Sequence, residues 1–210
     1  MPRGCFGILL AGGLARRMGG GDKGLRPIAG ASILERVIAA MRPQCDGLVL
    51  NANGDPARLA GFGLPIVPDD LPGFKGPLAG ILAGLDWIAA HQPEMPNAVS
   101  VPTDTPFLPA DLVERLESSR AKKGTEIACA RSGGRVHPVV TLWPVAIRHD
   151  LRYALVDEDL RKMGGFTQRY RVAEVDWPVE PFDPFFNANE PADIAAAEDL
   201  ANEVLANKLS

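Results

Sequence analysis

The chain has few cysteines and no long apolar run, and both absences exclude whole classes of protein. Its 210 residues include three cysteines, none of them in a CxxC pair, so neither a zinc site nor a disulfide framework is indicated. Cys5 and Cys129 lie in apolar contexts and are expected to be small core residues. No stretch has the length of a membrane span, and the N-terminus lacks the apolar region of a signal peptide, so the expected location is the cytoplasm.

A strong net charge of either sign is absent as well. The formal net charge is −4, so binding to nucleic acid or to a membrane surface is not expected. Positive charge is instead local, because Arg16, Arg17 and Lys23 all fall within residues 10–24. This local cluster favours a small anionic ligand.

Several catalytic signatures are also missing. No Gly-Lys-Ser/Thr follows the first glycines at the spacing of a Walker A loop. Gly19 and Gly21 lie too far from the end of the preceding strand to form a dinucleotide fingerprint. No Ser/His/Asp set stands out, so covalent catalysis has no support.

What the chain does contain is a glycine-rich, cationic segment, LAGGLARRMGGGDKG, directly after an apolar run. Each glycine weakens regular structure by about 1 kcal/mol, so such a run needs a reason. One reason is close approach of the backbone to a phosphate, with backbone groups near Leu10 and Ala11 facing a base or ribose. The alternative is a surface turn with solvated cations.

Strand-like and helix-like segments alternate along the chain. This order predicts an α/β fold with a Rossmann-like, mostly parallel sheet flanked by helices, in a single domain over 1–210. A capping box from Ser32 to Glu35 begins one helix, and Pro77 begins another. The expected strands are 5–10, 47–51, 64–67, 97–101, 126–130, 138–142 and 169–176, with further helices around 112–116 and from about 189.

Polar side chains follow several of these strands at the point where each one ends. Asn51 and Asn53 follow one strand, Asp69 and Asp70 the next, and Asp104 a later one. Ligands of open parallel sheets bind beyond the carboxyl ends of the strands, so these residues are expected to converge with the glycine-rich segment.

Each of these residues also has a plain structural alternative. Asp104, flanked by Pro102 and Pro106, is well placed to bind Mg²⁺, but it could instead cap the helix that follows. Asp69 could accept hydrogen bonds from a guanine edge or a ribose, or it could form an Asx turn. Asn51 likewise has two possible roles, as a contact to a base or ribose or as a turn residue.

Two later motifs add candidates near the C-terminal half. Asn187 in FFNANEP suits a ligand or a metal-bound water, whereas Asn189 fits a helix N-cap. His137 in RVHP could contact a phosphate or could be a structural histidine. His91 and His149 lie in polar helical contexts and are expected at the surface.

Taken together, these motifs resemble the nucleotidyltransferases of the molybdenum-cofactor branch, and most closely the molybdenum cofactor guanylyltransferases, which attach GMP to molybdopterin. The resemblance continues through DKGL, LVLNAN, GPLAGI, PTDTPFLP, RVHP and FFNANEP, and it covers nearly the whole chain in the same order. It implies the three-layer sandwich of nucleotide-diphospho-sugar transferases, with a nucleotide-binding half over about 1–105 and an acceptor half over about 106–210.

The resemblance also implies site residues. Carried over motif by motif, the nucleotide site is Leu10, Ala11, Gly12, Gly13, Lys23, Asn51, Asp69 and Asp104. Lys23, Arg17 (or its neighbour Arg16) and Asp104 would be catalytic, with Asp104 holding Mg²⁺, for which Mn²⁺ could substitute. Gly80, His137 and Asn187 would lie towards the pterin or acceptor side.

The implied reaction is transfer of GMP from GTP to molybdopterin, with or without molybdenum, and release of pyrophosphate. The implied partners are these substrates and, transiently, proteins that deliver the cofactor or receive it. Relatives that use CTP look like LAAG where this chain has LAGG, so Gly12 and Gly13 favour guanine.

Three alternatives remain open from the residues. One is a cytidylyltransferase, another is a related nucleotidyltransferase with a different phosphorylated acceptor, and the third is a non-catalytic guanine-nucleotide-binding assembly factor. The presence of Lys23 and Asp104 argues against the third, because a binding module has less need of a metal carboxylate.

Overall fold

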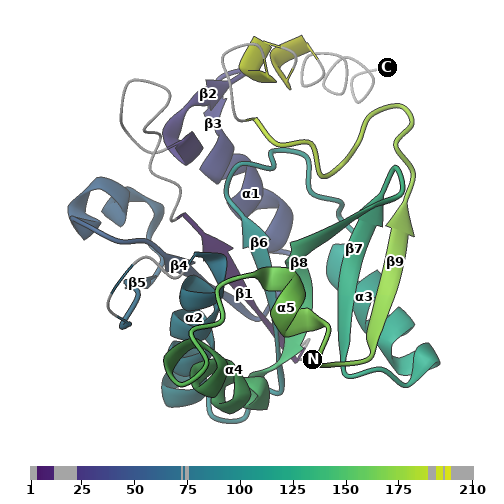
Figure 1. Cartoon of the computed structure of the whole chain (residues 1–210). Coiled ribbons are helices and arrows are strands. Elements are labelled where there is room, and N and C mark those ends of the chain that lie inside the picture. Colours follow the sequence, from purple (N-terminus) through teal and green to yellow (C-terminus); the bar gives the residue numbers. More distant parts are fainter. Residues whose placement is uncertain are drawn as a thin grey trace.

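The computed structural model describes residues 4–11, 23–71, 73, 76–188, 193–195 and 197–199. Its centre is a seven-stranded sheet in the order β5-β4-β1-β6-β8-β7-β9 (Figure 1). The strands are β1 (Cys5–Leu10), β4 (Gly47–Asn51), β5 (Ile66–Val67), β6 (Asn97–Pro102), β7 (Ile127–Ser132), β8 (Arg135–Pro144) and β9 (Val172–Trp177). A separate ribbon pairs β2 (Pro27–Ile28) with β3 (Ala31–Ser32).

The helices are α1 (Ile33–Met41), α2 (Pro77–His91), α3 (Leu112–Lys123), α4 (Arg148–Val156) and α5 (Met163–Thr167), with the short 3-10 helices η1 (Lys23–Leu25), η2 (Pro56–Phe62) and η3 (Val145–Ile147). Residues of α1 and α3 pack into one apolar core, and residues of α2, α4 and α5 pack into a second. Figure 1 shows these last three helices together on one side of the sheet. The molecule is therefore a three-layer sandwich, as the motifs imply.

The sheet is mostly parallel, and β8 is the exception. It runs antiparallel to both β6 and β7, whereas the other pairings in this sheet are parallel. The cause is a tight hairpin between β7 and β8, in which Gly133 and Gly134 have φ of 53° and 77°. Two consecutive positive φ values favour a two-residue turn that returns the chain antiparallel. Residues 131–137, which lie between the expected strands 126–130 and 138–142, are therefore largely strand.

Local signals set most element boundaries. The capping box at Ser32 and Glu35 is present, since the Ser32 hydroxyl accepts from the Glu35 amide and the Glu35 carboxylate accepts from the Ser32 amide. Cys5 and Cys129 are buried, as expected. In the part of the chain that the structure describes, no helix is both long and apolar enough to cross a membrane.

Two further strand boundaries differ from the sequence expectation. The strand expected over 64–67 is only Ile66–Val67, because only these two residues pair with β4 at the sheet edge. The strand expected from residue 169 begins at Val172, since the amides of Arg169 and Tyr170 donate to Phe166 and Thr167 carbonyls and close the turn after α5. The expected helix start at Asn189 lies outside the described residues, and helical conformation is seen at 193–195 and 197–199.

Candidate active site

A cavity of about 390 Å³ opens at the carboxyl ends of the central parallel strands. Its wall combines the end of β1, η1, the residues after β4, β5 and β6, the start of β8 and the segment around Phe185. The site residues expected from sequence that line it are Leu10, Ala11, Lys23, Asn51, Asp69, Asp104, His137 and Asn187. Of the others, Gly12, Gly13 and Arg17 lie outside the described residues, and Gly80 lies beside the cavity.

Backbone hydrogen bonds continue past the strand ends and hold this edge together. The Ala11 amide donates to the Asn51 carbonyl over 2.8 Å. The Leu10 carbonyl accepts from both the amide and the hydroxyl of Thr103, each over 3.2 Å. The segments that carry the polar residues are therefore fixed relative to one another before any ligand binds.

Asp69 is held by two asparagine side chains. Asn51 Nδ2 donates to one carboxylate oxygen over 2.9 Å, and Asn53 Nδ2 donates to the other over 2.8 Å. The Asp69 amide in turn donates to Asn53 Oδ1 over 2.8 Å. Such reciprocal contacts fix both the position and the rotation of the carboxylate, so this wall of the cavity presents a preorganised set of polar groups.

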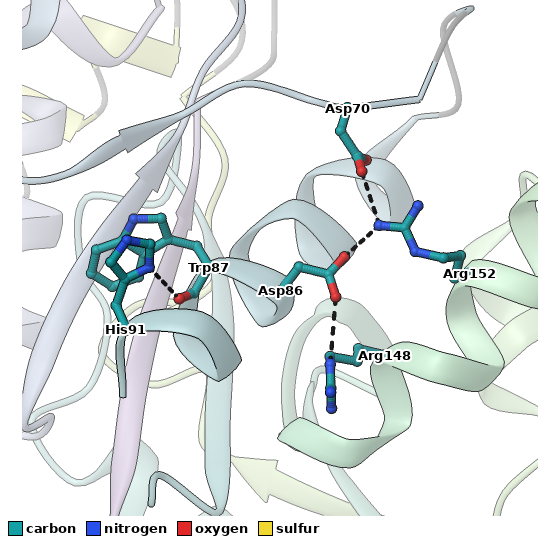
Figure 2. Close-up of polar contacts among 6 residues, drawn as sticks. All are labelled: Asp70, Asp86, Trp87, His91, Arg148 and Arg152. Atoms are coloured by element: carbon teal, nitrogen blue, oxygen red, sulfur yellow. Dashed lines mark hydrogen bonds and ion pairs between the residues drawn. The ribbon is translucent and has the colours of Figure 1, made fainter. Parts of the chain in front are cut away.

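The neighbouring Asp70 points elsewhere, towards α4. Figure 2 shows its carboxylate accepting from Arg152 Nη2, over 2.9 Å, while the same nitrogen donates to Asp86 of α2 over 2.7 Å. Arg148 approaches the other oxygen of Asp86 at 3.5 Å. Hydrogen bonds to the two carboxylates raise the pKa of Arg152. Asp70 thus ties the loop after Asp69 to α4.

Gly80 lies on α2 beneath Asn51. A Cβ added at Gly80 would overlap the Asn51 Oδ1 atom and lie 2.8 Å from its Cγ. The resemblance implied a place on the acceptor side, whereas the structure places this residue under the Asn51–Asp69 pair. Only a residue without a side chain allows the asparagine to occupy that position.

Asp104 carries an unsatisfied carboxylate oxygen at the cavity. Its Oδ1 atom is buried and has no hydrogen-bond partner among the described residues. Burial raises the pKa of the Asp104 carboxyl, and the positive charge of Lys23 lowers it in part. The alternative role as a helix cap is not seen, because the residue at the N-cap of α3 is Asp111.

The donor set around Asp104 fits a divalent cation that is shared with a ligand. Mg²⁺ prefers oxygen ligands and is commonly bound through one or two carboxylates together with substrate phosphates. No group of three or more His, Cys, Asp or Glu able to hold a metal occurs in the described ranges. A cation at Asp104 would therefore complete its coordination with phosphate oxygens and water.

The three histidines have different surroundings. His137 lines the cavity and lies against the Phe185 ring, with centroids 4.8 Å apart. Burial is the main cause that lowers the pKa of His137. His91 stacks on Trp87 at the end of α2 (Figure 2), and both His91 and His149 are exposed, as expected.

Comparisons with known proteins agree with this arrangement. A family model described as a MobA-like NTP transferase domain matches residues 7–172. A molybdenum cofactor guanylyltransferase of Bradyrhizobium sp. (strain ORS 278) is 63% identical over 195 residues, covering 93% of this chain and 92% of that protein. This chain belongs to the molybdenum cofactor guanylyltransferase family. A member from Rhodopseudomonas palustris (strain BisB5) is 61% identical, covering 92% of each chain.

A solved structure supports the same fold. The crystal structure of molybdopterin-guanine dinucleotide biosynthesis protein A from Archaeoglobus fulgidus has a TM-score of 0.71 and 23% identity, covering 94% of this chain and 99% of that one. The family resemblance and the three-layer α/β fold expected from the motifs are thus confirmed.

Some cavity residues were not identified from sequence. Thr103 bonds the Leu10 carbonyl, and Phe185 packs against His137. Ser132 and Asp183, which lie behind the cavity, were also not identified from sequence, although they are close in sequence to the motifs RVHP and FFNANEP. These two residues are recognised by their contacts across a hairpin and between distant segments, and such contacts are seen only in the tertiary structure.

Proposed function

We propose that this protein transfers GMP from GTP to molybdopterin, free or loaded with molybdenum, and releases pyrophosphate. The observation that carries the proposal is the buried, unpartnered Oδ1 of Asp104, in a cavity that Lys23 also lines, in a chain of the guanylyltransferase family. A carboxylate left without a protein partner is costly, so its presence at a cavity indicates a ligand role.

GTP would bind with its nucleoside against the first half of the sheet. Leu10 and Ala11 at the end of β1 would face the base and ribose, together with the fixed Asp69 carboxylate and Asn51. Gly12 and Gly13 continue from this strand end in sequence and are assigned to the same nucleotide site through the family motif.

The chemistry is an in-line displacement at the α-phosphorus of GTP. An oxygen of the terminal phosphate of molybdopterin forms the new P–O bond, and the bond from the α-phosphorus to the bridging oxygen of pyrophosphate breaks. The attacking phosphate is already ionised at neutral pH, so no general base is required. The barrier lies in bringing two anions together, which makes positioning and charge neutralisation the main contributions of the protein.

Lys23 would supply one of the neutralising charges, and Arg17 is assigned a second through the family motif. Mg²⁺, or Mn²⁺ in its place, would be held by Asp104 and would supply positive charge to phosphate oxygens when bound. Asp104 must be ionised for this role, and Lys23 favours that ionised form.

The acceptor would enter from the side formed by the start of β8 and the segment around Phe185. His137 and Asn187 line the cavity there. In this proposal the two substrates bind at opposite ends of one cavity, with Asp104 between the segments that bind them.

The direct test is pyrophosphate release from GTP, CTP and ATP, each with and without molybdenum-loaded molybdopterin, in Mg²⁺ and then in EDTA. We expect release with GTP only, and only when both molybdopterin and the cation are present. Release with CTP would identify a cytidylyltransferase. GTP binding without release under any condition would identify an assembly factor and reject the proposed reaction.

A further inference from the structure

Three polar side chains form a chain that ends at the acceptor side of the cavity. Ser132 Oγ lies 2.7 Å from His137 Nε2, and the same hydroxyl donates to Asp183 Oδ1 over 2.8 Å. Ser132 is only 2% exposed. His137 lines the cavity, whereas Ser132 and Asp183 lie behind it. The chain therefore runs from the half-buried Asp183, through the buried Ser132, to the cavity wall.

The β7–β8 hairpin explains how two of these residues meet. Ser132 pairs with Arg135 next to the turn, and Ala130 pairs with His137 two residues further from it. Residues two apart on a strand share a face, so Ser132 and His137 are diagonal neighbours on the same side of the hairpin. Asp183 reaches them from the segment after β9, which lies parallel to β7.

The donors and acceptors in this chain determine which ring nitrogen of His137 carries a proton. An ionised carboxylate only accepts hydrogen bonds, so the single hydroxyl proton of Ser132 is directed to Asp183. Ser132 Oγ must then accept from His137, which requires a proton on Nε2. Nδ1 is left as the basic atom of the ring.

Asp183 also fixes the surface on which the imidazole rests. Its Oδ1 accepts from the Phe185 amide over 2.9 Å, and the Phe185 ring packs against His137. Trp177 supports the far side of Phe185 edge-on, with centroids 5.4 Å apart. One carboxylate thus controls both the ring edge, through Ser132, and the ring face, through Phe185.

We propose that Ser132 and Asp183 are positioning residues that hold His137 with Nε2 protonated, so that Nδ1 takes up a proton from water when the phosphate of the acceptor binds, keeps it, and donates a hydrogen bond to a phosphate oxygen. This inference rests on the proposed function, because it assigns the acceptor's phosphate to His137. The Asp183 carboxylate, through Ser132, offsets the positive charge of the imidazolium that forms.

The charges around His137 agree with such a change on binding. Burial and the nearby Arg135 lower the pKa of His137, whereas Asp183 raises it, and the lowering dominates. Lys23 and Asp104 line the same cavity. The lowered pKa favours the neutral ring without ligand, and an incoming phosphate anion supplies the negative charge that favours protonation.

The first test is ¹⁵N NMR of the histidine rings in the full chain, which has three histidines. His137→Gln assigns the relevant signals. We expect a proton on Nε2 and none on Nδ1 in the free protein at pH 7, and protonation of both nitrogens once molybdopterin is added. A proton on Nδ1 in the free protein, or no change on adding molybdopterin, would overturn the inference.

The second test separates the two substrates kinetically. Asp183→Asn and Ser132→Ala should each raise KM for molybdopterin about tenfold and leave KM for GTP within about twofold, because a charge-assisted contact to the acceptor is lost. Asp176→Asn is the control, since Asp176 is also a carboxylate beside β7 but faces Arg131, which is next to Ser132 and on the other face of the strand.

The outcomes distinguish the inference from the proposed function. Equal changes in both KM values, or none, would show that Ser132 and Asp183 do not act through acceptor binding. A wild-type protein that releases no pyrophosphate from GTP with molybdopterin would instead reject the proposed function, whatever the NMR result.

Discussion

The amide of Ala188 donates a hydrogen bond to the carbonyl of Asp104 over 2.9 Å. These residues are far apart in sequence, one in each half of the chain. The bond holds Asn187, the residue before Ala188, beside the segment that carries the metal-binding candidate. The cavity is therefore closed by a direct backbone link between the two halves, and the carboxylate of Asp104 is left available for a ligand.

Replacing the Asp104 carboxylate should abolish turnover without unfolding the protein. Asp104→Asn keeps the size of the side chain but removes the negative charge that would hold the cation, so pyrophosphate release should fall by about two orders of magnitude or more. The far-ultraviolet circular dichroism should be unchanged. Near-normal Mg²⁺-dependent release in this variant would exclude Asp104 as the metal ligand.

The same substitution should make the metal-free protein more stable at neutral pH. Burial raises the pKa of Asp104 in the folded state, so the folded protein binds this proton more tightly than the unfolded chain does. Stability from this group is therefore greatest at acid pH and is lost as the pH rises through the ordinary aspartate pKa to the raised folded pKa.

In EDTA, Asp104→Asn should accordingly unfold at a higher temperature than wild type at pH 7, with a free energy of unfolding larger by about 1 kcal/mol, and the difference should vanish at about pH 3. Scanning calorimetry at the two pH values provides the measurement. A variant less stable than wild type at pH 7 would contradict the expected cost of the ionised carboxylate.

Substitutions of two glycines of α2 should distinguish an effect on the shape of the cavity from an effect on core packing. Gly80→Ala would displace Asn51 and with it Asp69, so KM for GTP should rise about tenfold. Gly84→Ala places its Cβ 2.6 Å from Ile8 Cγ2, away from the cavity. It should lower stability by about 1–3 kcal/mol and leave KM for GTP near the wild-type value. Equal kinetic effects of both variants would argue against the role assigned to Gly80.

Arg152 should affect nucleotide binding although it does not line the cavity. Arg152→Gln releases Asp70 from α4 and loosens the loop that follows Asp69, so KM for GTP should rise about threefold. Stability should change by less than about 1 kcal/mol, because these ion pairs are partly exposed. Arg148→Gln is the matched control, since Arg148 forms an ion pair with Asp86 but none with Asp70. An unchanged KM in Arg152→Gln would show that the loop holds its position without this ion pair.

The sequence by itself determined the repeating local structure. The capping box at Ser32, Pro77 at the start of α2, and the apolar strand runs are signals within a few residues of one another, and the expected elements formed there. The order of strands and helices then implied the sheet edge at which Lys23, Asn51 and Asp104 meet, because parallel strands end on the same side.

Only the tertiary structure decided which of two similar neighbours faces the cavity. Asp69 and Asp70 are identical in type and adjacent, yet one bonds Asn51 and the other bonds Arg152, which is 82 residues away from Asp70 in sequence. The antiparallel course of β8 and the contact of Ser132 with Asp183 depend on pairing across the sheet in the same way. Such pairings join distant segments, so no local pattern of residues contains them.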